Sequence, residues 1–232
     1  MKKVLLSVTV SLLAITTAFA QANKKHVMFG IGGGTLHYSG DIATDITVNS
    51  LLKETGTNGL FSMKIYLNEH FTLGGELSRG TIYASDENHR FSDRGLDLTC
   101  NVNQGNGYVE WTFARFFKRR GMNGNGVIEE QKTTSLYLKA GAGLIYWSPN
   151  LTVNDPAVLS GITVYNDRYL GGNYLIGGGL AYQINRKSSL VIDVSGHYVL
   201  TDRLDGFQFK NNNTAYDYYA GLSVRYYYAI LK

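Results

Sequence analysis

Apolar and polar residues alternate with a period of two along most of the chain, which is the spacing of a β-strand whose two faces meet different surroundings. After residue 20 no segment shows the 3.6-residue period and the capping residues of an amphipathic helix. The alternation predicts about eight strands, the smallest number found in outer-membrane barrels. The expected strands are 26–38, 58–67, 71–83, 100–117, 134–147, 172–184, 189–200 and 216–230.

The expected connections alternate between short turns and long loops. Residues 68–70 and 185–188 are tight turns, whereas the connections on the other side are long and polar. Outer-membrane barrels show this asymmetry, with short periplasmic turns and long outer loops, and an even strand number returns the chain to the side where it began. Both termini are therefore expected in the periplasm. The long loops are expected at 39–57, 84–99, 148–171 and 201–215.

The two faces of the expected strands predict which side of the sheet meets lipid. In 189–200, Ile192 and Val194 lie on one face, and Asp193 and Ser195 lie on the other. In a membrane barrel the apolar face meets lipid and the polar face lines the lumen. A sheet of a soluble protein, with these charges on its solvated face, is the alternative.

Six charged residues, three of each sign, fall on the expected lumen face. If neighbouring strands pair their charges, the ion pairs are Lys64–Glu76, Glu110–Lys139 and Asp193–Arg225. The interior of an eight-stranded barrel is only wide enough for side chains to fill it. Glycines on the same face are expected to leave room for the larger residues, so the sequence predicts a filled lumen without a large open channel. These glycines are Gly141, Gly143, Gly177 and Gly179.

Composition agrees with a membrane barrel. The 232 residues include 27 glycines, 17 tyrosines and only 2 prolines, and abundant tyrosine is typical of the aromatic girdles at the two membrane interfaces. After residue 20 no run is long and apolar enough for a transmembrane helix, so a membrane-spanning form has to close its sheet to satisfy every backbone group. The expected fold is all-β, an eight-stranded antiparallel up-and-down transmembrane β-barrel in the cell outer membrane.

The first twenty residues have the features of a cleaved signal peptide, namely Lys2 and Lys3, an apolar run, and Ala18-Phe19-Ala20 at its end. The barrel domain is then expected at 21–232. Removing the two lysines lowers the net charge from +4 to +2, which does not indicate a nucleic-acid partner. The single cysteine, Cys100, cannot form an internal disulfide and is interpreted as a thiol without a chemical role.

Several short motifs have chemical interpretations that we weigh against structural ones. "GIGGGT" at 30–35 is similar to a dinucleotide-binding glycine loop but is followed by strand and loop instead of a helix. The aspartates of "SGDIATD" and "TDRLDGF" lack the spacing of a calcium loop and are interpreted as strand-end turns with, at most, weak affinity for cations. His37 and His197 do not have the spacing of a metal site. No cofactor and no metal are expected.

Asp193, Ser195 and His197 are the three residue types of a hydrolase triad. Successive residues on one face of a strand are about 6–7 Å apart, which we take to exceed the hydrogen-bond reach of a nucleophile and its base. These side chains are therefore interpreted as hydrogen-bonding residues of the lumen, and no catalytic residue is expected.

Two motifs at expected strand ends carry a resemblance to a known family. The first matches a Tyr-x-Gly-Asp-hydrophobic turn, and the second a Thr-Asp-x-Leu-Asp segment after the seventh strand. With these motifs the chain resembles a Bacteroidota outer-membrane β-barrel family that includes the porin-like accessory barrel of the type IX secretion system. Gly206 stands where that family often has a second acidic residue. The matching residues are Tyr38, Gly40, Asp41 and Ile42 in the first motif and Thr201, Asp202, Leu204 and Asp205 in the second.

The resemblance implies a structural or accessory role in the cell envelope, with outer-membrane lipid and periplasmic secretion components as partners. A small-solute porin and a lipid-modifying outer-membrane enzyme are the alternatives. The long connection "KRRGMNGNGVIEEQK", 118–132, is expected to dock the partner, because it is flexible in composition and places Lys118, Arg119 and Arg120 beside the membrane edge. The alternative is that these basic residues only meet lipid phosphates.

Overall fold

The computed structural model describes residues 27–39, 42, 54–88, 95–117, 133–154, 158, 161–185, 187–201, 203–209 and 217–230. The expected signal peptide at 1–20 therefore lies outside the described residues. No helix in the described part of the chain is long and apolar enough to cross a membrane. A short 3-10 turn, η1 (Asp86–Asn88), follows the third strand.

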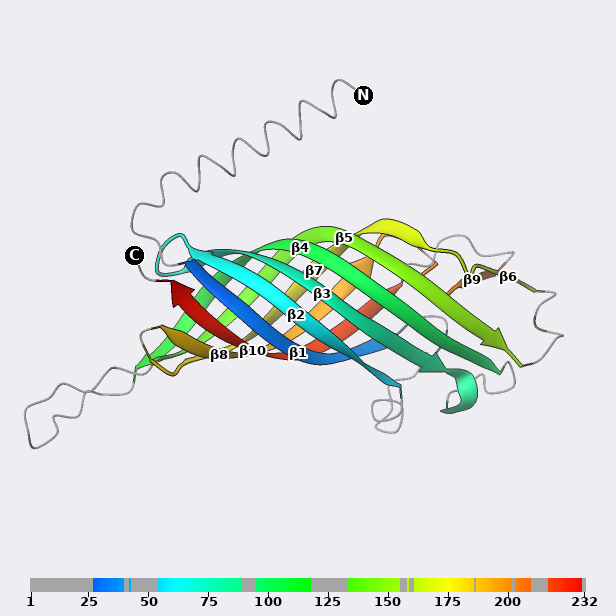
Figure 1. The fold of residues 1–232 in the computed structure, drawn as a ribbon, viewed down its shortest axis with the longest axis horizontal. Helices are drawn as coiled ribbons and strands as arrows, with labels where there is room; N and C mark the ends of the chain where they lie inside the picture. Colours follow the sequence, from blue (N-terminus) through cyan, green and yellow to red (C-terminus); the bar gives the residue numbers. More distant parts are fainter. Residues whose placement is uncertain are drawn as a thin grey trace, which may run out of the picture.

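Eight antiparallel strands close into a barrel, in the spatial order β1-β10-β8-β7-β5-β4-β3-β2 (Figure 1). The first and last strands complete the barrel by pairing along their length, from Val27 opposite Ile230 to Ser39 opposite Tyr218. The predicted all-β, eight-stranded up-and-down fold is confirmed. The barrel strands are β1 (Val27–Ser39), β2 (Thr55–Tyr66), β3 (Phe71–Ser85), β4 (Leu96–Phe117), β5 (Thr133–Val153), β7 (Tyr169–Gln183), β8 (Ser188–Val199) and β10 (Tyr218–Ile230).

Two short turns lie at the same end of the barrel as the start of β1 and the end of β10 (Figure 1). Each is closed by an asparagine: Asn68 accepts hydrogen bonds at 2.8 Å from the backbone N–H groups of His70 and Phe71. Asn185 does the same for Lys187 and Ser188 at 2.8 Å, which is the usual turn chemistry of this residue. We call this end the periplasmic end, because outer-membrane barrels have short turns there, and the opposite end the loop end.

The strands are strongly staggered around the barrel. A hydrogen-bonded row that leaves β7 at Leu170 passes through β5, β4, β3, β2, β1, β10 and β8 and returns to β7 at Leu180, ten residues (180 minus 170) further along. Stagger and strand number together set the tilt and the width of a barrel. An eight-stranded barrel is narrow enough for side chains to fill most of its interior.

The outer wall is a belt of exposed apolar side chains. Ile176 and Leu170 in β7 are 71% and 69% exposed, and the outward faces of β8 and β10 are apolar along their length, as predicted. Aromatic residues edge the belt, with Trp111 and Phe71 toward the periplasmic end and Tyr146 toward the loop end. A closed barrel with this surface spans a membrane with its strands, and barrels of this even-stranded kind belong to the outer membrane.

The interior changes character along the barrel axis. At mid-height it is polar, as predicted. Toward the periplasmic end it is mixed, because a small apolar cluster that includes Met28, Val191 and Ala229 lines the same cavity as Lys64 and Glu110, and toward the loop end it is an apolar core. The expectation of a polar filling throughout is therefore wrong, because strand residues beyond the lipid belt reverse their pattern and turn apolar side chains inward. The apolar cluster comprises Leu36, Tyr38, Ile42, Ile82, Ala84, Leu96, Leu98, Cys100, Val102, Ile145, Trp147, Leu151, Ile162, Val199, Leu204, Phe207 and Tyr219.

This reversal explains why several strands extend further than expected at the loop end. The periodicity predicts an end at residue 147 for β5, but the strand continues to Val153, with Asn150 exposed and Leu151 buried. Its polar outward residues have the composition of a loop, and only their alternation with buried apolar ones marks a strand. β4 likewise starts at Leu96, before the expected residue 100.

The long connections add two strands that the periodicity does not predict. β6 (Ile162–Val164) and β9 (Phe207–Phe209) form a small antiparallel sheet at the loop end (Figure 1). Ile162 and Phe207 are buried in the apolar cluster, together with Leu204 from the same connection as β9. These connections therefore pack their side chains into the loop end of the lumen.

Substitution of outward residues tests the position of the belt. Ile176→Arg places a charge in the middle of the apolar wall and is expected to destabilise the folded barrel by about 2–4 kcal/mol, whereas Asn150→Arg, beyond the belt, is expected to cost about 0–1 kcal/mol. Denaturant titration of the protein in lipid vesicles measures both values. Equal destabilisation by the two variants would contradict the assigned membrane boundary.

Candidate functional site in the barrel lumen

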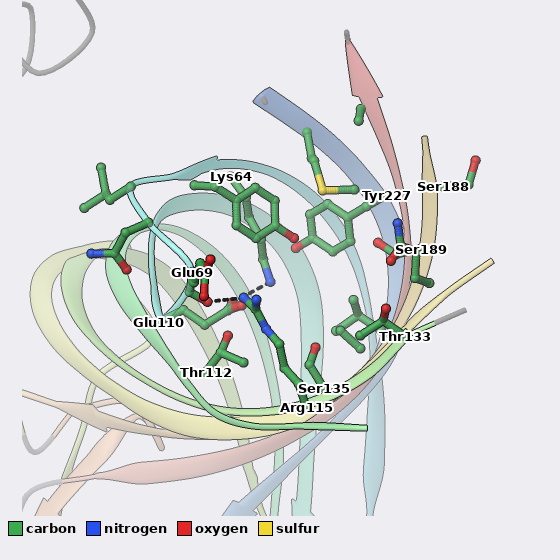
Figure 2. A pocket seen from close by; sticks show the side chains of 18 of the residues that line it. Lys64, Glu69, Glu110, Thr112, Arg115, Thr133, Ser135, Ser188, Ser189 and Tyr227 are labelled. Atoms are coloured by element: carbon green, nitrogen blue, oxygen red, sulfur yellow. Dashed lines mark hydrogen bonds and ion pairs between the residues drawn. The ribbon is translucent and has the colours of Figure 1, made fainter. Parts of the chain in front are cut away.

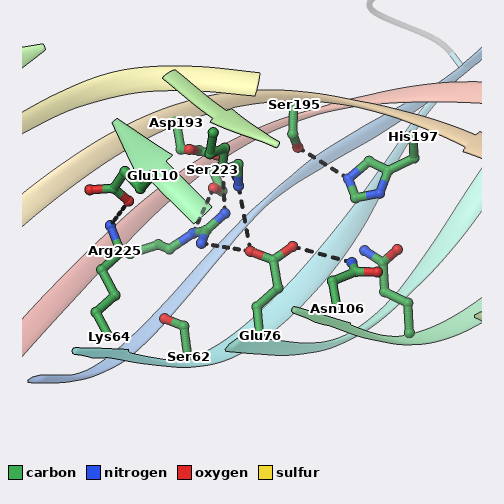
Figure 3. Close-up of polar contacts among 12 residues, drawn as sticks. Ser62, Lys64, Glu76, Asn106, Glu110, Asp193, Ser195, His197, Ser223 and Arg225 are labelled. Atoms are coloured by element: carbon green, nitrogen blue, oxygen red, sulfur yellow. Dashed lines mark hydrogen bonds and ion pairs between the residues drawn. The ribbon is translucent and has the colours of Figure 1, made fainter. Parts of the chain in front are cut away.

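Four charged side chains meet in the lumen, and Figure 3 labels three of them, Glu76, Asp193 and Arg225. Arg225 donates to Glu76 at 2.9 Å and to Asp193 at 3.0 Å. The Lys139 ammonium lies 2.8 Å from Asp193 and 3.5 Å from Glu76, so each cation contacts both carboxylates. All four are buried. Tyr137 adds a hydrogen bond of 2.6 Å to Asp193. We call these four charged residues the central cluster.

A second ion pair lies beside the central cluster. The Lys64 ammonium is 2.5 Å from the Glu110 carboxylate, and both side chains are buried. Lys64 also lies 4.8 Å from the ring centroids of both Tyr137 and Tyr227, which fits cation–π contacts with two rings. Together, this pair and the central cluster contain three cations and three anions.

The structure corrects two of the three predicted ion pairs. Asp193–Arg225 is confirmed, but Lys64 pairs with Glu110 instead of Glu76. Lys139 pairs with Asp193 and Glu76 instead of Glu110. Glu110 and Lys139 are directly opposite each other in the strand register, yet their charged groups point to other partners. The prediction assumed contacts between adjacent strands, whereas in this narrow lumen side chains reach past a neighbouring strand.

Glycines on β7 make these longer contacts possible. Gly179 lies between Tyr137 and Asp193 in one hydrogen-bonded row, and a Cβ placed there would be 2.8 Å from the Tyr137 hydroxyl. A Cβ at Gly177 would be 3.1 Å from Cε of Lys139 and closer still to the β8 backbone. The predicted role of the lumen glycines is therefore confirmed: they leave space for the side chains that cross β7 to Asp193.

Ser195 and His197 lie in the lumen beside the central cluster (Figure 3). The Ser195 hydroxyl is 3.2 Å from His197 Nε2, so the expectation that their spacing prevents a hydrogen bond is wrong, because the two side chains lean toward each other along the strand. The triad is still incomplete, since Asp193 contacts Arg225, Lys139 and Tyr137 instead of His197. The His197 ring stacks on Tyr219 at 4.6 Å.

Some buried polar atoms in this region have no protein partner. Among the described residues, Asn106 Oδ1, Tyr108 OH and Asn173 Oδ1 are buried without a hydrogen bond. Buried polar groups of this kind are commonly satisfied by internal water molecules. The polar part of the lumen is thus suited to isolated waters between the side chains.

The lumen opens into a cavity of about 580 Å³ at the periplasmic end (Figure 2). Lys64 and Glu110 lie on its wall, together with Tyr66, Glu69 and Tyr227. The prediction of a filled lumen therefore holds for the middle and loop end of the barrel and is wrong for this end. We call the cavity the periplasmic vestibule.

Arg115 is a vestibule residue that sequence reasoning missed. By strict alternation it shares the outward face of Trp111, but the register of β4 against β5 shifts between Thr112 and Ala114. This bulge turns Arg115 into the vestibule, where its guanidinium donates to the backbone oxygen of Glu69. The break in alternation around Phe113 and Phe116 was the available signal.

At the loop end, residues from both family-like motifs come together. The Tyr38 hydroxyl lies 3.2 Å from an Asp205 oxygen and 2.7 Å from an Asp217 oxygen. Asp217 also accepts a hydrogen bond of 2.7 Å from the Leu204 backbone, and Thr201 accepts one of 3.2 Å from the Asp217 backbone. These contacts hold the segment after β8 against the end of β1.

Several predicted residues lie outside the described residues. They include Gly40, Asp41 and Asp202 of the family-like motifs and the basic group Lys118, Arg119 and Arg120. Within the described part of the chain, no group of three or more His, Cys, Asp or Glu side chains is arranged to hold a metal ion. Cys100 is a free, buried thiol in the apolar cluster.

This chain is similar to known proteins in fold alone. No family model matches the sequence, and no curated protein matches it. Neisserial surface protein A (NspA) is 12% identical with a TM-score of 0.46, over 88% of this chain and 96% of that one. A major outer membrane protein from Thermus thermophilus is 12% identical with a TM-score of 0.46, over 88% and 99%. Ail, the attachment invasion locus protein of Yersinia pestis, is 12% identical with a TM-score of 0.40, over 89% and 99%.

A double-mutant cycle tests the central cluster. Asp193→Leu leaves buried cations short of a carboxylate and is expected to destabilise the barrel by about 3–5 kcal/mol. The double variant Asp193→Leu with Arg225→Leu is expected to lose less stability than the sum of the two single variants. The difference is expected to be about 0.5–3 kcal/mol, because the two side chains share one contact. Denaturant titration in vesicles measures each value. A cycle between Asp193 and the exposed Arg168 is the additive control, and additivity in both cycles would contradict the pairing.

Proposed function

We propose that the protein is an integral outer-membrane barrel with a structural or accessory role in the cell envelope and without catalytic activity. The observation that carries this proposal is the closure of the lumen at two levels. The central cluster fills the barrel at mid-height, and the apolar cluster fills it at the loop end. A barrel closed in this way acts through its surfaces and its ends.

The two-level closure argues against a small-solute porin. The periplasmic vestibule opens toward the periplasm, but it ends at the Lys64–Glu110 pair and the tyrosines that flank it. Beyond this pair, a solute would have to separate the central cluster and then cross a packed apolar core. Separating buried, hydrogen-bonded charges is costly in a low-dielectric interior.

The position of Ser195 and His197 argues against a lipid-modifying enzyme. Their side chains are 7% and 3% exposed and point into the lumen, away from the lipid that such an enzyme would act on. A general base also needs a partner that orients it. Asp193, the candidate for that role, is engaged by two cations and Tyr137.

A more specific proposal is that the protein is a component of type IX protein secretion. It is supported by the sequence resemblance and by the contact between Tyr38 and Asp205, one residue from each family-like motif. In this proposal the connection 118–132 contacts periplasmic components of the secretion complex, and Lys118, Arg119 and Arg120 contribute its positive charge.

Conductance across a planar lipid bilayer tests the closed lumen. The wild-type protein is expected to show no stable conductance, because no water-filled path crosses the two clusters. Trp147→Ala with Phe207→Ala removes apolar filling and the hydrogen bond from Trp147 to Arg203, and it is expected to stay closed because the central cluster remains. A large porin serves as the positive control for insertion and detection. Stable channels formed by the wild type would favour the porin alternative.

Deletion within the long periplasmic connection tests the secretion assignment. Replacing residues 121–130 with Asn-Gly is expected to leave folding and heat-modifiability intact, because loop length has a small effect on stability, and to abolish crosslinks to periplasmic proteins. Neutralising Lys118, Arg119 and Arg120 to Gln separates partner docking from contact with lipid phosphates. Crosslinks and secretion that survive the deletion would contradict docking through this connection.

A further inference from the structure

Arg79 is an exception on the lipid-facing wall of the barrel. It lies in β3 with its side chain exposed on the outward face. Among the described residues of the eight barrel strands, the other charged side chain on the outward face is Asp97, at the loop end of β4. Asp97 accepts hydrogen bonds from Ser85 at 2.6 Å and from Asn154 at 3.1 Å. Arg79 has no hydrogen bond or ion pair with any described residue.

The height of Arg79 in the wall determines what it can reach. Along the outward face of β3, Phe71, Leu73 and Leu77 precede it, and Tyr83 follows it toward the loop end. Arg79 is four residues from Tyr83, about 13 Å along the strand and less along the membrane normal because the strands tilt. An arginine in hydrocarbon destabilises a barrel, and the penalty falls toward zero at the interface. Its long side chain can extend to the headgroup level of the leaflet at the loop end.

Polar side chains surround Arg79 on the same outward face. Asn103 is its direct partner in the register with β4, close enough for the two side chains to bind one group. One step toward the loop end, Thr81 donates a hydrogen bond of 3.1 Å to Asn101, which leaves the amide N–H groups of Asn101 free to donate outward. On β2, the other neighbour of β3, Gly59 is the register partner of Arg79, and a Cβ at Gly59 would meet nothing within 4 Å. The patch is therefore open to an approaching molecule.

This polar patch occupies one side of the barrel. On the other side, β7, β8 and β10 carry large apolar residues on their outward faces up to the loop end, including Leu170, Tyr198 and Tyr218. Directly below Arg79, Leu77 is 62% exposed and presents an apolar surface to the membrane. The patch thus combines hydrogen-bond donors toward the loop end with an apolar surface toward the middle of the membrane. This arrangement matches the headgroup and the acyl chains of a lipid.

We propose that Arg79, Asn101 and Asn103 form a binding site for the phosphate headgroup of a lipid in the leaflet at the loop end. The guanidinium can donate two parallel hydrogen bonds to one phosphate, and this geometry makes arginine better suited than lysine to bind it. The two asparagine amides supply further donors, and the acyl chains lie along Leu77. The site is expected to select a lipid over free phosphate because the acyl chains add an apolar contact with Leu77 that inorganic phosphate cannot make.

Lipid titration of the refolded full chain tests the site. The protein is held in dodecyl maltoside, which contains no phosphate, and binding of phosphatidic acid is measured by native mass spectrometry. Arg79→Gln is expected to weaken binding by about tenfold or more, since it removes charge-assisted hydrogen bonds. Arg79→Lys is expected to give an intermediate loss. Arg168→Gln removes the same charge from an exposed site between β6 and β7 and is expected to leave binding unchanged.

Three results would overturn the proposal. The first is equal affinity of wild type and Arg79→Gln, and the second is an equal loss in Arg168→Gln, which would indicate attraction by net charge. The third is displacement of the lipid by inorganic phosphate at matching concentration, which would assign the site to a free anion. Diacylglycerol, which lacks the phosphate, is expected not to compete. Arg79 makes no hydrogen bond or ion pair with a described residue, so the variants are expected to fold, and the heat-dependent gel shift checks this.

Discussion

The narrow closed barrel is the constraint on which the rest of this structure depends. Backbone hydrogen bonds join each strand only to its neighbours, whereas the central cluster joins β3, β5, β8 and β10 through the middle of the lumen. Because the space is too small for mobile water around each charge, every charged group needs a partner of opposite sign. The glycines of β7 follow from the same constraint, since they provide the space through which Lys139 and Tyr137 reach Asp193.

The barrel wall passes through two environments and is built differently in each. Within the lipid belt the outside is apolar and the inside polar, and beyond it the outside is polar and the inside apolar, as in a water-soluble protein. Trp147 shows how the two regions are joined, because its ring packs in the apolar cluster while its Nε1 donates to the backbone oxygen of Arg203 at 2.9 Å. The long connections thus become part of the barrel core at the loop end.

Because the lumen is closed, the functional surfaces are expected on the outside of the barrel and at its two ends. The periplasmic vestibule and the ends of β4 and β5 that flank the connection at 118–132 lie at the periplasmic end. The polar patch around Arg79 belongs to the wall. The proposed accessory role and the proposed lipid site therefore use separate parts of the molecule, and each experiment can fail without the other.

Alternation along the chain was sufficient to predict the barrel, its strand number, the lipid-facing residues and the six lumen charges, because strand geometry forces residues two apart onto one face. The partners of those charges depended on tertiary structure, since Lys64 reaches Glu110 past an intervening strand. Tertiary structure also determined the bulge that turns Arg115 inward and the burial of Phe207 from a distant connection. The local pattern determines the face of each residue, whereas stagger, bulges and the width of the closed lumen determine what that residue meets.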